Sequence, residues 1–222
     1  MHSTVLQIGL LWHVLAVVLS SIAIGYAIKR TPLNALLAEP RLQHLLFGAM
    51  ALLMLTWTFR AGLSDGLSVH FLGITVLTLM FGWDLAILAG AVAMIGITIL
   101  GIERWDMLAI NIMAIVIVPT TITQAILKYV EHKYPPNFFT YLFLVAFIGA
   151  GISVASAGLT LAFVLGSSGV LSWTTIYQEY VILLPLIMFP EALLNGTLMT
   201  AVMVFHPDWI RTFDAEKYID NQ

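Results

Sequence analysis

Cysteine is absent from this 222-residue chain, and charged residues are scarce at 9%. Without cysteine there is no disulfide, thiolate metal site, iron–sulfur cluster or cysteine nucleophile. A soluble domain has roughly 25% charged residues, whereas here 60% of the residues are hydrophobic and the mean hydropathy is +0.98. This composition predicts an integral membrane protein. No basic run favours a nucleic-acid partner.

Positive charge is also missing from the start of the chain, where no Lys or Arg precedes Lys29. A cleaved signal peptide needs a positive amino-terminal region, so the first apolar segment is expected to stay in the membrane. A spanning helix needs about 20 mostly apolar residues. Seven segments qualify, of which the third is short and could be partial or tilted: 5–28, 43–59, 71–82, 84–102, 107–129, 138–166 and 175–205.

We therefore expect an all-α membrane protein with about seven transmembrane helices. Residues 1–207 would form a single transmembrane domain and residues 208–222 a short tail. Pro185 and Pro190 predict a kink or a local unwinding in the seventh segment. Asp84 is expected to cap the start of the fourth segment.

The few Lys and Arg residues predict the orientation, because they favour cytoplasmic loops. With the amino terminus outside, two of them fall in outer loops, Arg60 and Arg104. The other seven fall inside: Lys29, Arg30, Arg41, Lys128, Lys133, Arg211 and Lys217. The chain is thus expected to start outside and to end in the cytoplasm, with His2 and His70 at the same outer face.

The opening Met-His pair could chelate a metal ion. The Met1 amine, the backbone amide between Met1 and His2, and the His2 imidazole would form small, nearly planar rings, and His70 could supply a fourth nitrogen. Such a donor set suits Ni(II) or Cu(II), and Co(II) also accepts imidazole. The competing interpretation is that His2 is an ordinary polar terminal residue and His70 an interfacial side chain.

Polar groups at membrane depth are functional candidates by default. Glu191 follows Pro190 in the seventh segment, and Asn195 lies one turn further on. Glu191 could act behind the metal ligands or on a cation path, or it could belong to a structural hydrogen-bond cluster. Asn111 could orient His70 by a hydrogen bond or could join two helices. Asp65, in the loop before His70, is a further candidate for a hydrogen bond to a ligand.

Several of these stretches resemble a known family. The chain opens with Met-His, "GLSVHFLG" holds His70 before a short span, and "LAINIMAIVIVP" places Asn111 at the start of another. "FPEALLNGTLMTAVMVF", around Glu191, is similar to a stretch in the last span of that family. The sequence thus resembles the CbiM-type membrane components of cobalt/nickel energy-coupling-factor transporters, as a divergent branch. The resemblance implies that Met1, His2 and His70 coordinate the metal.

The leading hypothesis is a membrane permease component that binds nickel or cobalt, with copper allowed by the ligands, for uptake into the cytoplasm. The chain has no Walker motif, so ATPase and transmembrane coupling subunits would be its partners beside the lipid bilayer. It would be a multi-pass protein of the bacterial inner (cell) membrane. No paired catalytic carboxylates or nucleophile elbow support an enzyme. The alternative is a structural or assembly subunit of a larger membrane complex that kept a transporter-like fold.

Overall fold

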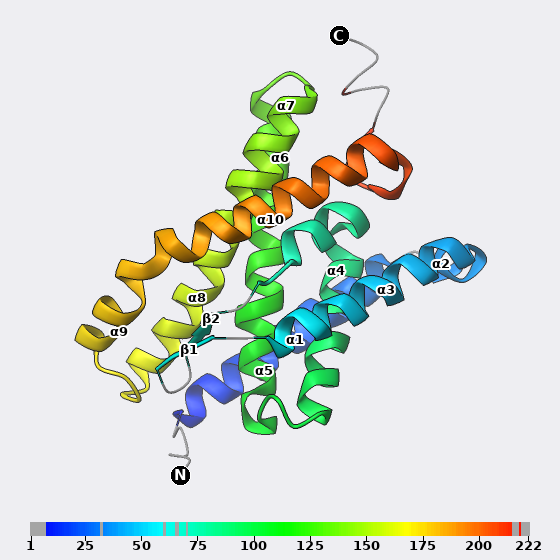
Figure 1. Cartoon of the computed structure of the whole chain (residues 1–222). Coiled ribbons are helices and arrows are strands. Elements are labelled where there is room, and N and C mark those ends of the chain that lie inside the picture. The colour runs from blue at the N-terminus through cyan, green and yellow to red at the C-terminus, as the bar shows by residue number, and fades with distance from the viewer. Residues whose placement is uncertain are drawn as a thin grey trace.

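The described part of the chain folds as a bundle of helices with a small β-hairpin (Figure 1). The structure is a computed structural model that describes residues 8–31, 33–59, 61–64, 67–69, 71–214 and 218. Its strands, β1 (Ala61–Ser64) and β2 (Leu67–Val69), pair antiparallel with Ala61 opposite Val69. Its α-helices are α1 (Leu10–Arg30), α2 (Leu33–Ala38), α3 (Pro40–Thr58), α4 (Ile74–Ile99), α5 (Leu108–Asn111), α6 (Val118–Lys133), α7 (Phe138–Thr140), α8 (Gly149–Ser167), α9 (Trp173–Glu179) and α10 (Leu184–Phe205).

Shorter helical turns join several of these elements into longer rods. Three-residue 3-10 turns lie at Trp105–Met107, Val181–Leu183 and Pro207–Trp209, and π-helical stretches at Ile112–Ile117 and Tyr141–Ile148. Pro119, which has no N–H to donate, follows the first π-helical stretch and accounts for the missing regular bond there. The seventh expected segment is interrupted at Val181–Leu183, just before Pro185, so the predicted local break is confirmed there. Pro190 lies inside α10, which continues through it as one helix.

Five helical rods in the described part of the chain are long and apolar enough to cross a membrane: Leu10–Arg30, Ile74–Ile99, Trp105–Lys133, Phe138–Ser167 and Trp173–Phe205. The second expected segment, 43–59, largely coincides with the 19-residue helix α3, which is long enough but not apolar enough to count among these rods. The sixth, 138–166, matches its rod closely. The number of crossings and their orientation therefore stay predictions, while the mostly helical, membrane-type architecture is established.

The third and fourth expected segments are joined in one broken helix, α4. Gly82 has φ 83° and ψ 167° inside it, a conformation that is open essentially to glycine alone. The residues before it, 74–81, form a half-helix, hereafter the α4 half-helix. Eight residues rise only about 12 Å, far less than the roughly 30 Å of a bilayer core. The expected span over 71–82 is therefore a partial one.

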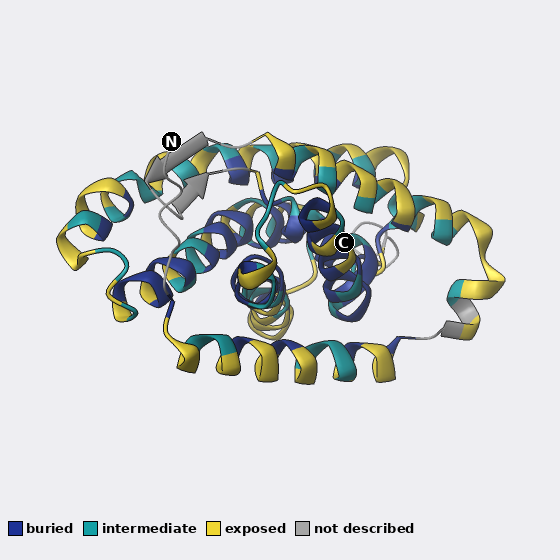
Figure 2. Ribbon diagram, turned by 90° about the horizontal axis from the view of Figure 1, so that it is seen from below, coloured by how far each residue is buried: buried dark blue, intermediate teal, exposed yellow. Residues whose placement is uncertain are grey.

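The core is built around α4. Most of its residues are buried, and it contacts α1, α3, α6 and α8, whereas α1 is largely exposed. Figure 2 shows buried residues gathered on the inner helices and exposed ones on the outer helices. Small residues permit this close packing: a Cβ on Gly90 would meet Val116 Cγ1 at 2.6 Å. The apolar outer surface fits a lipid environment.

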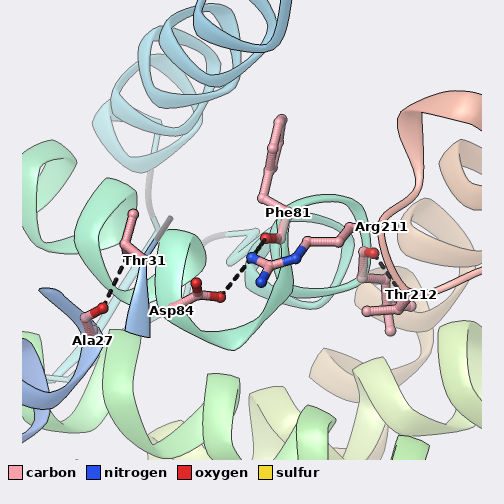
Figure 3. Close-up of polar contacts among 7 residues, drawn as sticks. Ala27, Thr31, Phe81, Asp84, Arg211 and Thr212 are labelled. Atoms are coloured by element: carbon pink, nitrogen blue, oxygen red, sulfur yellow. Dashed lines mark hydrogen bonds and ion pairs between the residues drawn. The ribbon is translucent and has the colours of Figure 1, made fainter. Parts of the chain in front are cut away.

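The carboxyl end of the α4 half-helix is capped by the chain's own tail (Figure 3). Because Gly82 breaks the helix, the carbonyls just before it lack helical partners. The backbone N–H of Arg211 donates to the Met80 carbonyl at 2.9 Å, and the Thr212 hydroxyl donates to the Leu79 carbonyl at 2.7 Å. Arg211 Nη1 donates to the Phe81 carbonyl at 2.9 Å and to Asp84 Oδ1 at 2.7 Å. Asp84 therefore pairs with Arg211, and its expected role as a helix cap was wrong.

Candidate metal centre

The predicted ligands Met1, His2 and His70, together with Asp65, lie outside the described residues. Their neighbours in the chain are described. Ile8 is buried, β2 ends at Val69, and Phe71 to Gly73 lead into the α4 half-helix. Within the part of the chain that the structure describes, no three His, Asp or Glu side chains lie close enough together to hold a metal ion.

The start of α1 and the strand before His70 pack against the same helix. The Trp12 ring meets the Phe163 ring of α8 edge-on, with their centres 5.7 Å apart. Strand β2 also contacts α8, and Figure 1 shows the hairpin at the same end of the bundle as the first turn of α1. Segments that adjoin residues 2 and 70 are thus brought to one end of the molecule.

Glu191 holds the backbone that follows His70. Its side chain comes from the middle of α10 and is only 2% exposed. Oε2 accepts the N–H of Leu72 and Oε1 accepts the N–H of Gly73, both at 2.9 Å. Both oxygens act as acceptors, as in an ionised carboxylate. They lie at the amino end of the α4 half-helix, where free N–H groups favour negative charge.

Asn195 extends this cluster by one helical turn. Its amide nitrogen donates to Glu191 Oε1 at 2.8 Å and to the Glu191 carbonyl at 2.7 Å. Its carbonyl oxygen accepts the N–H of Val76 at 3.0 Å, and the side chain is fully buried. Glu191 and Asn195 therefore bind three backbone N–H groups at the start of α4, and they join α10 to α4 as the structural interpretation of this pair expected.

Trp57 holds the same segment from another helix, α3. Its indole N–H donates to the Leu72 carbonyl at 3.1 Å, and the ring is 1% exposed within α3. Leu72 is thus held through its N–H by α10 and through its carbonyl by α3. Gly73 has φ 63°, a left-handed conformation that suits glycine and lets the chain turn sharply into the helix. The backbone two residues after His70 is therefore held by two helices, α3 and α10.

Asn111 makes a different contact from the one expected of it. Its amide nitrogen donates to Glu103 Oε2 at 3.0 Å, and the residue is 4% exposed on α5. The bond ties α5 to the loop that precedes it. Ser20 of α1 donates to the Ala109 carbonyl at 3.2 Å and binds the first helix to the same place. A role of Asn111 in orienting His70 stays a prediction.

A cation near this end of the bundle is neutralised locally. Arg104 binds Asp106 through two nitrogens, at 2.9 and 2.6 Å. These hydrogen bonds raise the pKa of Arg104, so the pair stays ionised. The positive charge of Arg104 is therefore offset by Asp106.

Sequence reasoning identified Glu191 and its neighbour Asn195 but missed Trp57 and Glu103. The signal for Glu191 was a carboxylate beside a proline within an apolar run, which is rare enough to attract attention. Trp57 gave no such signal, because tryptophan is common near the ends of membrane helices. Glu103 lies in a loop next to Arg104, where a charged residue gives no functional signal.

Comparison with known proteins agrees with the architecture. The family described as CbiM, cobalt uptake substrate-specific transmembrane region, matches residues 5–209. The matched region includes α1 to α10 and the Glu191 cluster, while Met1 and His2 precede it. No curated protein and no solved structure matched the chain. Because the match spans nearly all of the 222 residues, the chain belongs to the CbiM family of membrane components of cobalt uptake.

Proposed function

We propose that this chain is the subunit that binds Co(II) at the outer membrane face and presents it for uptake into the cytoplasm. Family membership supports cobalt as the cargo. The observation that carries the proposal is the fixed backbone after His70, held by Glu191 at 2.9 Å and by Trp57 at 3.1 Å. A segment held so firmly, at membrane depth, by a buried carboxylate is suited to present a ligand in one position.

The proposed ligands are the Met1 amine, the amide and imidazole of His2, and the imidazole of His70. All are nitrogen donors, and imidazole is a suitable ligand for first-row divalent metals. Both α1, which follows His2 in the chain, and β2, which precedes His70, pack against α8. This shared contact supports the proposed set of ligands. Asp65 and Asn111 are proposed to form hydrogen bonds to the metal-binding side chains rather than to bind the metal itself.

The Glu191 cluster would act by reducing the freedom of the His70 segment. A site whose ligands are already positioned loses less conformational entropy when the metal binds. Support from residues behind the ligands typically contributes 10-fold to 100-fold to metal affinity. The cluster would thus serve both the fold, by joining α10 to α4, and the affinity for cobalt.

Transport needs an energy source that the chain's motifs do not provide. ATP hydrolysis would come from ATPase subunits, coupled through a further membrane protein. The seven-to-two distribution of Lys and Arg supports an outside amino terminus in a bacterial inner membrane. Cobalt would then arrive at the end of the bundle that holds the β-hairpin.

Replacing His70 tests the proposal against a matched control. Co(II) binding to the purified protein is measured by titration calorimetry for His70→Ala and for His132→Ala, which lies in the last turn of α6. We expect His70→Ala to abolish tight binding and His132→Ala to leave it unchanged. Equal affinity of both variants would refute a site at His70. Repeating the titration with Ni(II) shows which metal the site prefers.

A further inference from the structure

A positively charged pocket lies at the end of the bundle opposite the β-hairpin. Its volume is about 460 Å3, and it is bounded by α1, α4, α6 and the tail after α10. Three cations line it: Arg30 at the end of α1, Lys128 in α6, and Arg211 in the tail. Asp84 is the acidic residue in its lining, and Arg211 Nη1 holds that carboxylate at 2.7 Å. The lining therefore carries a net charge of about +2, as three cations less one anion.

Two of the cations are available to a ligand. Arg30 and Lys128 are both exposed, and neither forms an ion pair with another residue in the described part of the chain. Arg30 lies over the Tyr26 ring, 5.6 Å from its centre. Thr121 and Gln124 of α6 add polar groups beside Lys128, so the α6 side of the pocket offers both charge and hydrogen bonds.

Aromatic rings join the two sides of this pocket. Tyr26 of α1 meets Trp83 of α4 edge-on, with ring centres 5.7 Å apart. Trp83 in turn donates its indole N–H to the Thr121 hydroxyl of α6 at 3.2 Å. Tyr and Trp with apolar bodies and polar tips are typical of the level where lipid headgroups meet the hydrocarbon.

An apolar row on α1 leads away from the pocket. Val18, Ile22 and Tyr26 are spaced by four residues, as are Tyr26 and Arg30, so all lie along one face of the helix. Val18 is 48% exposed, Ile22 64% and Tyr26 52%. A ligand with a phosphate at Arg30 could lay a hydrocarbon chain along this face. Free phosphate would gain nothing from it.

We propose that this pocket binds the phosphate of an anionic membrane lipid, with Arg30 and Lys128 on the headgroup and the α1 row on an acyl chain. Basic pockets between helix ends on the side where Lys and Arg gather are suited to anionic headgroups. The pocket also adjoins Gly82, where the α4 half-helix ends, and Arg211, which caps it. A bound lipid would thus hold α1, α4, α6 and the tail together.

The test uses short-chain lipids added to the purified full chain in an uncharged detergent. Binding of dihexanoyl phosphatidylglycerol, dihexanoyl phosphatidylcholine and inorganic phosphate is measured by native mass spectrometry. We expect the anionic lipid to bind far more tightly than the other two probes. The double variant Arg30→Gln/Lys128→Gln should weaken it by about fivefold for each cation removed.

A matched control removes the same charge from the same two helices. Lys29→Gln/Lys133→Gln changes exposed cations of α1 and α6 that do not line the pocket, and it should alter binding less than twofold. Equal loss in both double variants would show diffuse attraction and overturn the site. If phosphatidylcholine bound as tightly as phosphatidylglycerol, the pocket would not select an anionic headgroup, and the proposal would be wrong. If inorganic phosphate bound as tightly, the acyl chain would contribute nothing, and the ligand would not be a lipid. Single variants at Arg30 and Lys128 give the same readout if the double variant fails to fold.

Discussion

Replacing Glu191 by glutamine keeps the size of the side chain and removes its second acceptor oxygen. In the native protein Oε1 binds Gly73 N–H and the Asn195 amide, while Oε2 binds Leu72 N–H. Glutamine offers one oxygen and one NH2 group. Whichever way the amide points, it directs a donor at a backbone N–H or at the Asn195 amide, which are themselves donors.

The size of the effect follows from these bonds. A hydrogen bond to a charged group contributes about 1.5–3 kcal/mol, and an unpaired buried N–H costs about 1–3 kcal/mol. These two figures describe largely the same event, so we expect Glu191→Gln to destabilise the fold by about 2–3 kcal/mol. Because the freed segment follows His70 directly, cobalt affinity should fall by about 10-fold to 100-fold.

The assay compares Glu191→Gln with Glu179→Gln in the same detergent. Glu179 is the last residue of α9 and is exposed, so Glu179→Gln makes the same chemical change at a position without buried contacts. Thermal unfolding reports stability, and Co(II) titration calorimetry at a temperature where both variants are folded reports affinity. Native stability and affinity in Glu191→Gln would refute the reasoning. Lower stability with native affinity would reduce the cluster to a purely structural role.

Two further predictions concern the break in α4 and the orientation. Gly82→Ala should destabilise the protein by about 1–3 kcal/mol, because alanine is strained at φ 83° and its Cβ would meet Arg211 Nη1 at 3.0 Å; native thermal stability would contradict this. Single cysteines at Ser3 and Asn221 should be labelled from opposite sides of the membrane by an impermeant thiol reagent, and labelling from the same side would refute an odd number of crossings.

Local sequence patterns predicted the features that depend on neighbouring residues. The long apolar runs predicted the helical rods. Pro185 predicted the break before α10, because proline has no N–H to donate to a helical hydrogen bond. Gly82 marked a boundary between two expected segments. The sequence around it could not show that the eight residues before Gly82 form a helix too short for a full crossing. That outcome depends on φ 83° and on a cap supplied by Arg211.

The polar contacts of the site join residues far apart in the chain. Glu191 reaches Leu72 across 119 positions, and Arg211 reaches Asp84 across 127. Periodicity shows which residues share a helix face, but it does not show which helices meet. A rare carboxylate at membrane depth could therefore be selected from the sequence, whereas its partners had to come from the packing. Asp84 was assigned to a local cap because its true partner lies in the tail.

We propose the amino terminus itself as a ligand for cobalt. Co(II) binding by a protein extended by six glycines before Met1 is the decisive measurement, because the extension keeps both His2 and His70 and places the free amine too far from His2 to share a chelate with it. We expect the extended protein to lose tight binding. We also expect metal binding to the native protein to weaken as the pH falls through the titration range of imidazole, roughly 6.5 for free histidine, since protons compete with the metal. Unchanged affinity in the extended protein would contradict the chelate and leave His2 an ordinary surface histidine.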